Sequence, residues 1–200
     1  MASISRARRA AASAAALLLA CGPPKGIAPG AATAVNLPPP LPPRNLADVF
    51  LLEAAGAQPD DTVLSVPSRA PRVVVLRRSA PDFGLFAELN FPERVLTGAG
   101  DAAVARLGVH PRPGLYGIDF ELEGSLAEGA TIAFSYGAHF VAPAGARQRY
   151  GTDIAFEREL AIGRVVGDTL VIFLPTSRPG SDMLSAPLPG PGRYLVAAPR

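Results

Sequence analysis

The sequence has few of the residues that form covalent or metal-bound scaffolds. It contains one cysteine, two histidines and no tryptophan in 200 residues. A single cysteine cannot pair within the chain, which excludes an intramolecular disulfide framework and a cysteine-rich zinc site. With only His110 and His139 as imidazole ligands, we expect no metal and no cofactor. The absence of tryptophan also disfavours a carbohydrate-binding surface made of exposed aromatic rings.

The first twenty residues are typical of an export signal. Arg6, Arg8 and Arg9 occur there without any acidic residue, and residues 10–20 are an apolar run that only Ser13 interrupts. As a helix this run would rise about 16 Å, roughly half of the ~30 Å hydrocarbon core of a bilayer. The segment is therefore predicted to be a signal peptide and not a stable membrane span.

The only cysteine lies where the apolar run ends. The sequence Leu18-Leu19-Ala20-Cys21-Gly22 resembles the bacterial lipoprotein signal, in which leucine lies three residues before a lipid-modified cysteine and a small residue directly precedes it. The resemblance implies cleavage after Ala20 and acylation of Cys21. The lipid bilayer of the cell envelope would then hold the protein, at the outer membrane if the host has one. An ordinary secretory signal with an incidental Cys21 is the alternative.

The net positive charge of the chain comes from this predicted signal. The whole sequence has a net charge of +2, and removal of three arginines with residues 1–20 leaves 2 − 3 = −1. Binding to nucleic acid needs several aligned cations, and no cluster of basic and aromatic residues remains after the signal. We therefore do not expect nucleic acid as a partner.

Residues 21–44 are predicted to be a proline-rich tether. Eight prolines lie between Cys21 and Pro43. Proline lacks an amide donor and fixes its own φ, so this stretch favours polyproline II and cannot enter a helix interior or a sheet. A ligand for a proline-recognising partner is the alternative reading. The next segment, residues 45–60, is compatible with a short helix capped by Asn45 or with a first strand at 49–52.

From residue 61 onward the pattern predicts strands. Apolar and polar residues alternate with period two, which places one face of each strand in a core and the other in water. The clearest case is 117–123, where Ile118 and Phe120 alternate with acids. Further strands are expected at 62–66, 72–76, 85–91, 130–141, 154–162, 169–174 and 192–197. Residues 62–66 and 72–76 are predicted to pair as a hairpin, and 100–107 to be briefly helical.

Short strands separated by Gly and Pro turns favour an all-β fold. The chain has 20 glycines and 22 prolines, and it lacks the helical crossovers that a parallel sheet requires. Two amphipathic antiparallel sheets bury their apolar faces by packing on each other. The sequence therefore predicts an antiparallel β-sandwich, immunoglobulin-like or similar, over residues 61–200.

Two groups of side chains could carry hydrolytic chemistry. Asp119, Glu121 and Glu123 alternate on one strand face, at a spacing that suits an acid/base pair or a shared Ca²⁺. His139 could act with Ser135 and Asp153, although no Gly-x-Ser-x-Gly elbow occurs in the sequence. A solvated acidic strand face and a surface histidine explain the same residues without catalysis, so we expect a non-enzymatic protein.

One connection between strands has the composition of a recognition loop. Residues 143–153 are predicted to form the longest loop between strong strands, and they contain Arg147, Arg149 and Tyr150. Arginine and tyrosine are frequent anchors at interfaces, and loops on a rigid sandwich often bind partners. These three residues are the candidate binding loop, and a plain solvated loop is the alternative.

The order of segments over residues 86–197 resembles a known module. Phe91-Pro92, Pro111-Arg112-Pro113-Gly114-Leu115-Tyr116, Phe134-Ser135-Tyr136 and the closing Gly190-Pro191-Gly192-Arg193-Tyr194-Leu195-Val196 follow one another as in the ZU-type β-sandwich of zona-occludens proteins, ankyrins and netrin receptors. The resemblance implies a non-catalytic module that contacts other proteins. Together with the predicted anchor, it suggests an envelope lipoprotein with an envelope protein as its partner.

Overall fold

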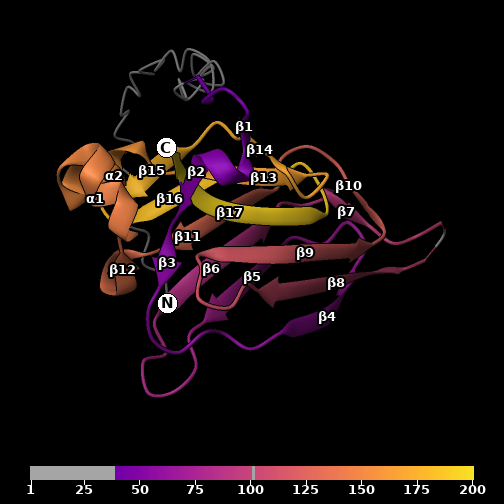
Figure 1. Ribbon diagram of the computed structural model, residues 1–200. Helices are drawn as coiled ribbons and strands as arrows, with labels where there is room; N and C mark the ends of the chain where they lie inside the picture. The colour runs from indigo at the N-terminus through magenta and orange to yellow at the C-terminus, as the bar shows by residue number, and fades with distance from the viewer. Residues whose placement is uncertain (1–38, 101) are drawn as a thin grey trace, which may run out of the picture. The chain divides into compact units, whose positions relative to one another are not determined.

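The computed structural model describes residues 39–100 and 102–200, and it is built from two large antiparallel sheets (Figure 1). The predicted signal peptide and most of the predicted tether lie outside the described residues. In order across the eight-stranded sheet lie β1 (Arg44–Asn45), β14 (Leu170–Phe173), β13 (Ala161–Val166), β17 (Gly192–Pro199), β9 (Gly117–Glu123), β8 (Val104–Pro111) and β4 (Thr62–Pro67), while β2 (Val49–Leu51) also pairs with β17.

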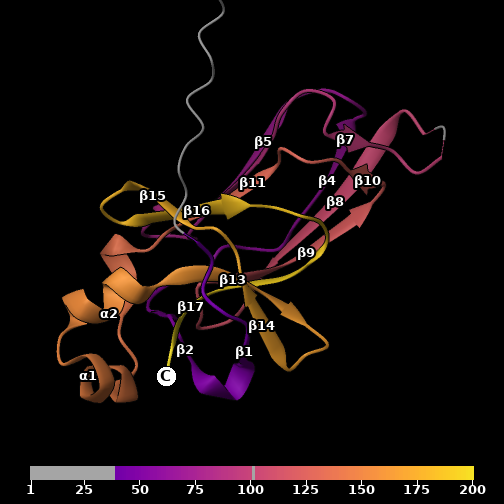
Figure 2. The same cartoon turned by 90° about the horizontal axis from the view of Figure 1, so that it is seen from above.

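The second large sheet has five strands. In order they are β15 (Ser177–Gly180), β16 (Met183–Pro187), β11 (Thr131–Ser135), β6 (Leu85–Phe91) and β5 (Arg72–Arg77). Two short pairs join β7 (Leu96–Thr97) to β10 (Ser125–Leu126) and β3 (Glu53–Ala54) to β12 (Phe140–Val141). Helices α1 (Ala144–Tyr150) and α2 (Asp153–Glu159) lie at one end of the sandwich, and β8 and β9 extend toward the other end (Figure 2). The prediction of an all-β antiparallel sandwich is confirmed.

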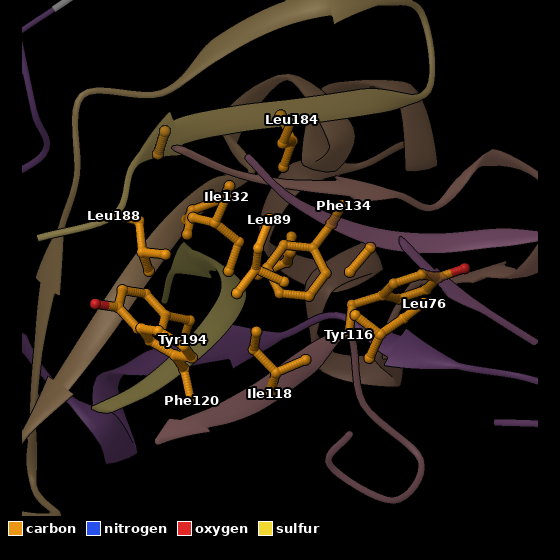
Figure 3. Packing of buried hydrophobic residues seen from close by; sticks show 14 of the residues in the cluster. Leu76, Leu89, Tyr116, Ile118, Phe120, Ile132, Phe134, Leu184, Leu188 and Tyr194 are labelled. Carbon is orange, nitrogen blue, oxygen red and sulfur yellow. The ribbon is translucent and has the colours of Figure 1, made fainter. Parts of the chain in front are cut away.

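The main core lies between the two sheets. Figure 3 shows Leu89, Ile132 and Phe134 of the five-stranded sheet facing Ile118 and Phe120 of the eight-stranded sheet. All five side chains are at most 1% exposed. Each alternates along its strand with a more exposed neighbour, as period two requires. Full burial of one such side chain stabilises the fold by about 1.5–3 kcal/mol.

A second, smaller core lies on the other side of the eight-stranded sheet. Along β17, Tyr194 and Val196 belong to the main core, whereas Leu195 and Ala197 belong to the second. Residues 39–51, which we call the N-terminal strap, contribute Leu41 and other leucines that pack against this second core. The sheet around β13 and β17 is therefore covered on both faces, and the strap belongs to the folded unit.

The strap also explains the ambiguity at residues 45–60. The strand alternative agrees with the structure, since β2 begins at Val49 and β3 follows it, whereas the expected helix is only the 3₁₀ turn η1 (Leu46–Asp48), which the Asn45 side chain does not cap. The backbone N–H of Leu46 donates to Thr169 O at 2.6 Å, and that of Arg200 donates to Asp48 O at 2.9 Å. These bonds tie the strap to both the β13–β14 turn and the C-terminal residues.

Two of the expected local structures are wrong. Residues 62–66 and 72–76 do not form a hairpin, because β4 pairs with β8 and β5 pairs with β6 in the other sheet. The connection between them carries the chain across the sandwich, with Arg69 at φ 65° and its N–H bonded to Leu96 O. Residues 104–107 are strand β8 and not helix, because Ala105 and Leu107 alternate into the core at 0% exposure.

The third difference is at residues 143–162. The predicted strand over 154–162 is helix α2 up to Glu159, and the predicted loop before it contains helix α1. The Thr152 hydroxyl accepts a hydrogen bond from the N–H of Ala155 at 3.1 Å, which caps α2. Phe156 is buried, and its ring lies 6.3 Å from that of Phe50. Capping and this single aromatic anchor therefore overcome the alternating pattern.

Candidate functional site

The predicted acids on β9 lie on the outer face of the eight-stranded sheet. The carboxylate of Asp119 accepts hydrogen bonds from Arg112 Nη1 and Arg193 Nε, both at 3.0 Å. Glu123 lies 3.9 Å from Arg106 Nη1 and is largely exposed. The three acids share one face, as their spacing predicted, and arginines on the same face engage two of them. These contacts suit a charged, solvated sheet surface.

A shallow hollow lies beside Glu121 on the same face. His110 Nδ1 is 3.0 Å from Asp61 Oδ2, and its Nε2 is 3.8 Å from Glu121 Oε2. Gly108 opens the space between them, because a Cβ there would lie only 3.0 Å from His110 Nε2. Within residues 39–100 and 102–200, no group of three or more His, Cys, Asp or Glu side chains is arranged to hold a metal ion.

His139 has a different carboxylate partner from the one predicted. Its Nε2 lies 2.6 Å from Asp82 Oδ2, on the loop between β5 and β6. Asp153 pairs instead with Arg147, from which its two oxygens accept hydrogen bonds at 2.8 and 2.9 Å. The predicted grouping of Ser135, His139 and Asp153 is therefore wrong.

Asp82 leads to a buried arginine that sequence reasoning missed. Arg78 is 2% exposed, and its Nη1 donates to Ala55 O at 2.9 Å and to Ala57 O at 3.0 Å. Its Nη2 donates to the Tyr116 hydroxyl at 2.7 Å, and its Nε lies 3.6 Å from Asp82 Oδ2. We call Arg78, Asp82, Tyr116 and His139 the Arg78 cluster.

Aromatic rings enclose the guanidinium of Arg78. Its carbon lies 5.4 Å from the ring centre of Phe86 and 5.3 Å from that of Tyr116, and these two rings stack on each other. The Tyr116 hydroxyl donates in turn to Tyr136 O at 3.1 Å. Burial raises the pKa of Tyr116, and the nearby positive charge of Arg78 opposes that shift. The cluster therefore holds a paired charge beside two aromatic rings, and it joins residues 55–57 to Tyr116, which directly precedes β9, and to the 79–84 loop.

A second tyrosine network supports helix α2. The Tyr136 hydroxyl donates to Glu157 Oε1 at 2.9 Å and accepts from Arg178 Nη1 at 3.1 Å. Burial, together with the bond to Glu157, raises the pKa of Tyr136 to about 12. Arg178 Nη2 also donates to three backbone carbonyls at the C-terminal end of α2, those of Glu157, Arg158 and Leu160. The Arg178 side chain therefore caps the C-terminal end of α2.

The candidate binding residues Arg147, Arg149 and Tyr150 lie on helix α1 and not on a loop. The hydrogen bonds from Arg147 lower the pKa of the Asp153 carboxyl and join α1 to α2. The Tyr150 hydroxyl donates to Pro199 O, so this residue is half-buried and structural. Only Arg149 of the three points to solvent without an ion-pair partner among the described residues. Cys21, the predicted lipidation site, lies outside the described residues.

No family model matches the chain, and no curated protein or solved structure has significant similarity to it. None of the helices in the described part of the chain is long and apolar enough to cross a membrane.

Proposed function

We propose that the chain is an exported protein held in the cell envelope by lipid on Cys21, and that its β-sandwich is a non-catalytic binding or structural module. The observation that carries the proposal is the position of the only cysteine. Cys21 directly follows an apolar run that is too short to span a bilayer, and a proline-rich stretch separates it from the fold. A lipid on Cys21 would keep the sandwich concentrated at the membrane, where weak contacts become effective.

The contacts of the polar side chains support a non-catalytic module. Asp119 is held by two arginines, and Arg78 binds the backbone carbonyls of Ala55 and Ala57. Such contacts connect segments of the fold, which is a structural role.

Replacement of the cysteine tests the anchor. We expect Cys21→Ser to remove the mass of the lipid and to move the protein from the membrane fraction to the soluble fraction. Ser13→Ala, a change in the same segment that leaves the cysteine in place, serves as the matched control and should keep both the lipid and the membrane location. An unchanged mass and an unchanged membrane fraction for Cys21→Ser would contradict the proposal.

An envelope hydrolase is the second candidate. The contact of 2.6 Å between His139 and Asp82 favours it, because carboxylates orient catalytic histidines in many hydrolases. Alanine at Asp119, Glu121 or His139 separates the two functions. A hydrolase would lose its turnover of a chromogenic ester or a peptide library, whereas a binding module would keep its partner and show no turnover to lose.

A further inference from the structure

The edge strands of the two large sheets differ in length and in proline content. At the edges of the eight-stranded sheet, β1 has two residues, and β4 ends in Pro67. In the five-stranded sheet, β15 contains Pro179 and an irregular register. Short strands, prolines and bulges hinder pairing at an edge. The fourth edge strand, β5, has six residues and no proline, and among the described strands it pairs only with β6 (Figures 1 and 2).

Strand β5 is anchored in the core and exposes apolar side chains on its outer face. Val74 and Leu76 belong to the main core at 5% and 2% exposure. Val73 and Val75, which alternate with them, are 46% and 43% exposed. An edge strand also offers every second backbone N–H and C=O to a further strand. A strand that pairs with β5 would therefore satisfy these backbone groups and cover the two valines.

The regular part of β5 is centred on Val74. The pairing with β6 keeps one register over residues 72–76 and shifts before Arg77. Residues that lie opposite each other in an antiparallel pair point to the same face of the sheet. Because this run has an odd number of residues, two copies of it can pair about a two-fold axis at Val74 with every side chain on its correct face.

The side chains of two such strands match each other. Val73 of each copy would lie opposite Val75 of the other, and the two Val74 residues would lie opposite each other. Apolar, β-branched side chains in these positions pack together and exclude water. Arg72 would lie opposite Leu76, and the arginines at position 72 of the two copies would be about 13 Å apart along the strands.

The charges beside β5 are also compatible with an identical strand. On the outer face, Arg77 follows Val75 by two residues, and Glu88 of β6 is the cross-strand partner of Val75. The outer face of β5 and β6 thus carries one charge of each sign. In the two-fold pair, neither charge lies directly opposite a like charge, which would destabilise a strand pair. A second copy therefore fits this edge in both apolar pattern and charge.

We propose that β5 pairs antiparallel with β5 of a second copy of the chain, about a two-fold axis at Val74, so that two five-stranded sheets join into one continuous sheet. Main-chain hydrogen bonds supply affinity, and the contacts between Val73 and Val75 fix the register. One strand pair buries much less than the roughly 1,600 Å² of a standard interface, so the dimer is weak in dilute solution. The inference goes beyond the proposed function, since strand pairing requires no lipid.

Cysteine cross-linking tests the register. The full chain with Cys21→Ser is used in mild detergent, so that an introduced cysteine is the only thiol. Val73→Cys and Val75→Cys are made as separate proteins and then mixed. Opposed Cα atoms are about 4.5–5.5 Å apart, which suits a disulfide, whereas two copies of the same position are diagonal and about 7–8 Å apart. We expect the mixture to form linked dimers on the order of tenfold faster than either protein alone.

Charged residues at the same two positions provide a second test. Val73→Lys/Val75→Lys places like charges opposite each other and should raise the dimer dissociation constant on the order of tenfold, as measured by sedimentation over a concentration series. Val73→Lys/Val75→Glu places opposite charges there and should stay within about threefold of the unmodified chain. Val166→Lys/Ile172→Lys, at exposed apolar positions of the eight-stranded sheet, is the matched control and should leave association unchanged.

Amide exchange checks the same strand without any substitution in it, and it should slow within residues 72–76 as the protein concentration rises. A chain that stays monomeric up to about 1 mM would overturn the proposal and leave this edge to a strand of another protein. Cross-linking of either cysteine protein alone as fast as that of the mixture would also overturn it, as would full association of Val73→Lys/Val75→Lys. The membrane location of the unmodified chain is scored separately, so a failure at β5 would leave the lipid anchor standing.

Discussion

Replacement of Arg78 by methionine tests whether the Arg78 cluster stabilises the fold. The change keeps most of the side-chain volume but removes the bonds to Ala55 O, Ala57 O and the Tyr116 hydroxyl. Two carbonyls and the buried Tyr116 hydroxyl then lose their donor. Removal of one partner from a buried, hydrogen-bonded charge pair commonly lowers the free energy of unfolding by about 3–5 kcal/mol. We expect the lower end of that range, about 3 kcal/mol, because Asp82 stays partly exposed and keeps its contact with His139.

The loss can be measured by urea and thermal unfolding. For a folded unit of this size, about 3 kcal/mol lowers Tm by roughly 6–12 °C. Without tryptophan, the near-ultraviolet circular dichroism reports mainly the tyrosines, so Tyr116 should lose signal in the same variant. Arg78→Lys keeps the charge but not the planar fork, and it should still cost about 2 kcal/mol.

An exposed arginine provides the control. Arg106 lies 3.9 Å from Glu123, with both side chains largely in solvent, so Arg106→Met should change the unfolding free energy by less than about 1 kcal/mol. If Arg78→Met were as mild as Arg106→Met, the cluster would not be a structural element and the reasoning would be refuted.

Two further predictions concern the tyrosines and helix α2. Burial raises the pKa of all four tyrosines, that of Tyr136 to about 12, above the ordinary value of 10.0. Because the folded state holds these protons more tightly, their contribution to stability is complete below pH 10 and is lost as the pH rises toward 12. Absorbance at 295 nm follows the ionisation of tyrosine and should rise at a higher pH in the folded chain than in the urea-unfolded chain. Coincident titrations of the two states would contradict the prediction. Arg178→Ala should lower the free energy of unfolding by about 1–3 kcal/mol and speed amide exchange in α2, because three carbonyls lose their donor. Arg158→Ala, at a neighbouring exposed position, is the control. If amide exchange in α2 were equally fast in the two variants, the cap would be unimportant.

The sandwich could be predicted because its signal is local. Alternation along β9 and β11 follows directly from one buried and one wetted face, and Ile118, Phe120, Ile132 and Phe134 lie in the core where period two places them. The pairing of β4 and β5 could not be predicted in the same way. Whether a short turn closes a hairpin or carries the chain to another sheet depends on bonds such as Arg69 N–H to Leu96 O, which join distant residues.

The Arg78 cluster was hidden for a similar reason. In sequence, Arg77-Arg78 is an ordinary basic pair, but one member is exposed and the other is enclosed by residues 21 to 38 positions away. Helix α2 shows the opposite failure. The spacing of Ile154 and Phe156 fits one buried face of a strand. In the structure only Phe156 is buried, and Ile154 is 63% exposed.

Strand β17 sets the order in which the protein can be completed. It lies between β13 and β9 and also pairs with β2, so three strands from the beginning, middle and later parts of the chain meet on it. The eight-stranded sheet cannot close before residues 192–199 have been synthesised and released from the ribosome. Until β17 is in place, β13 and β9 have no common neighbour, and the two halves of this sheet stay separate.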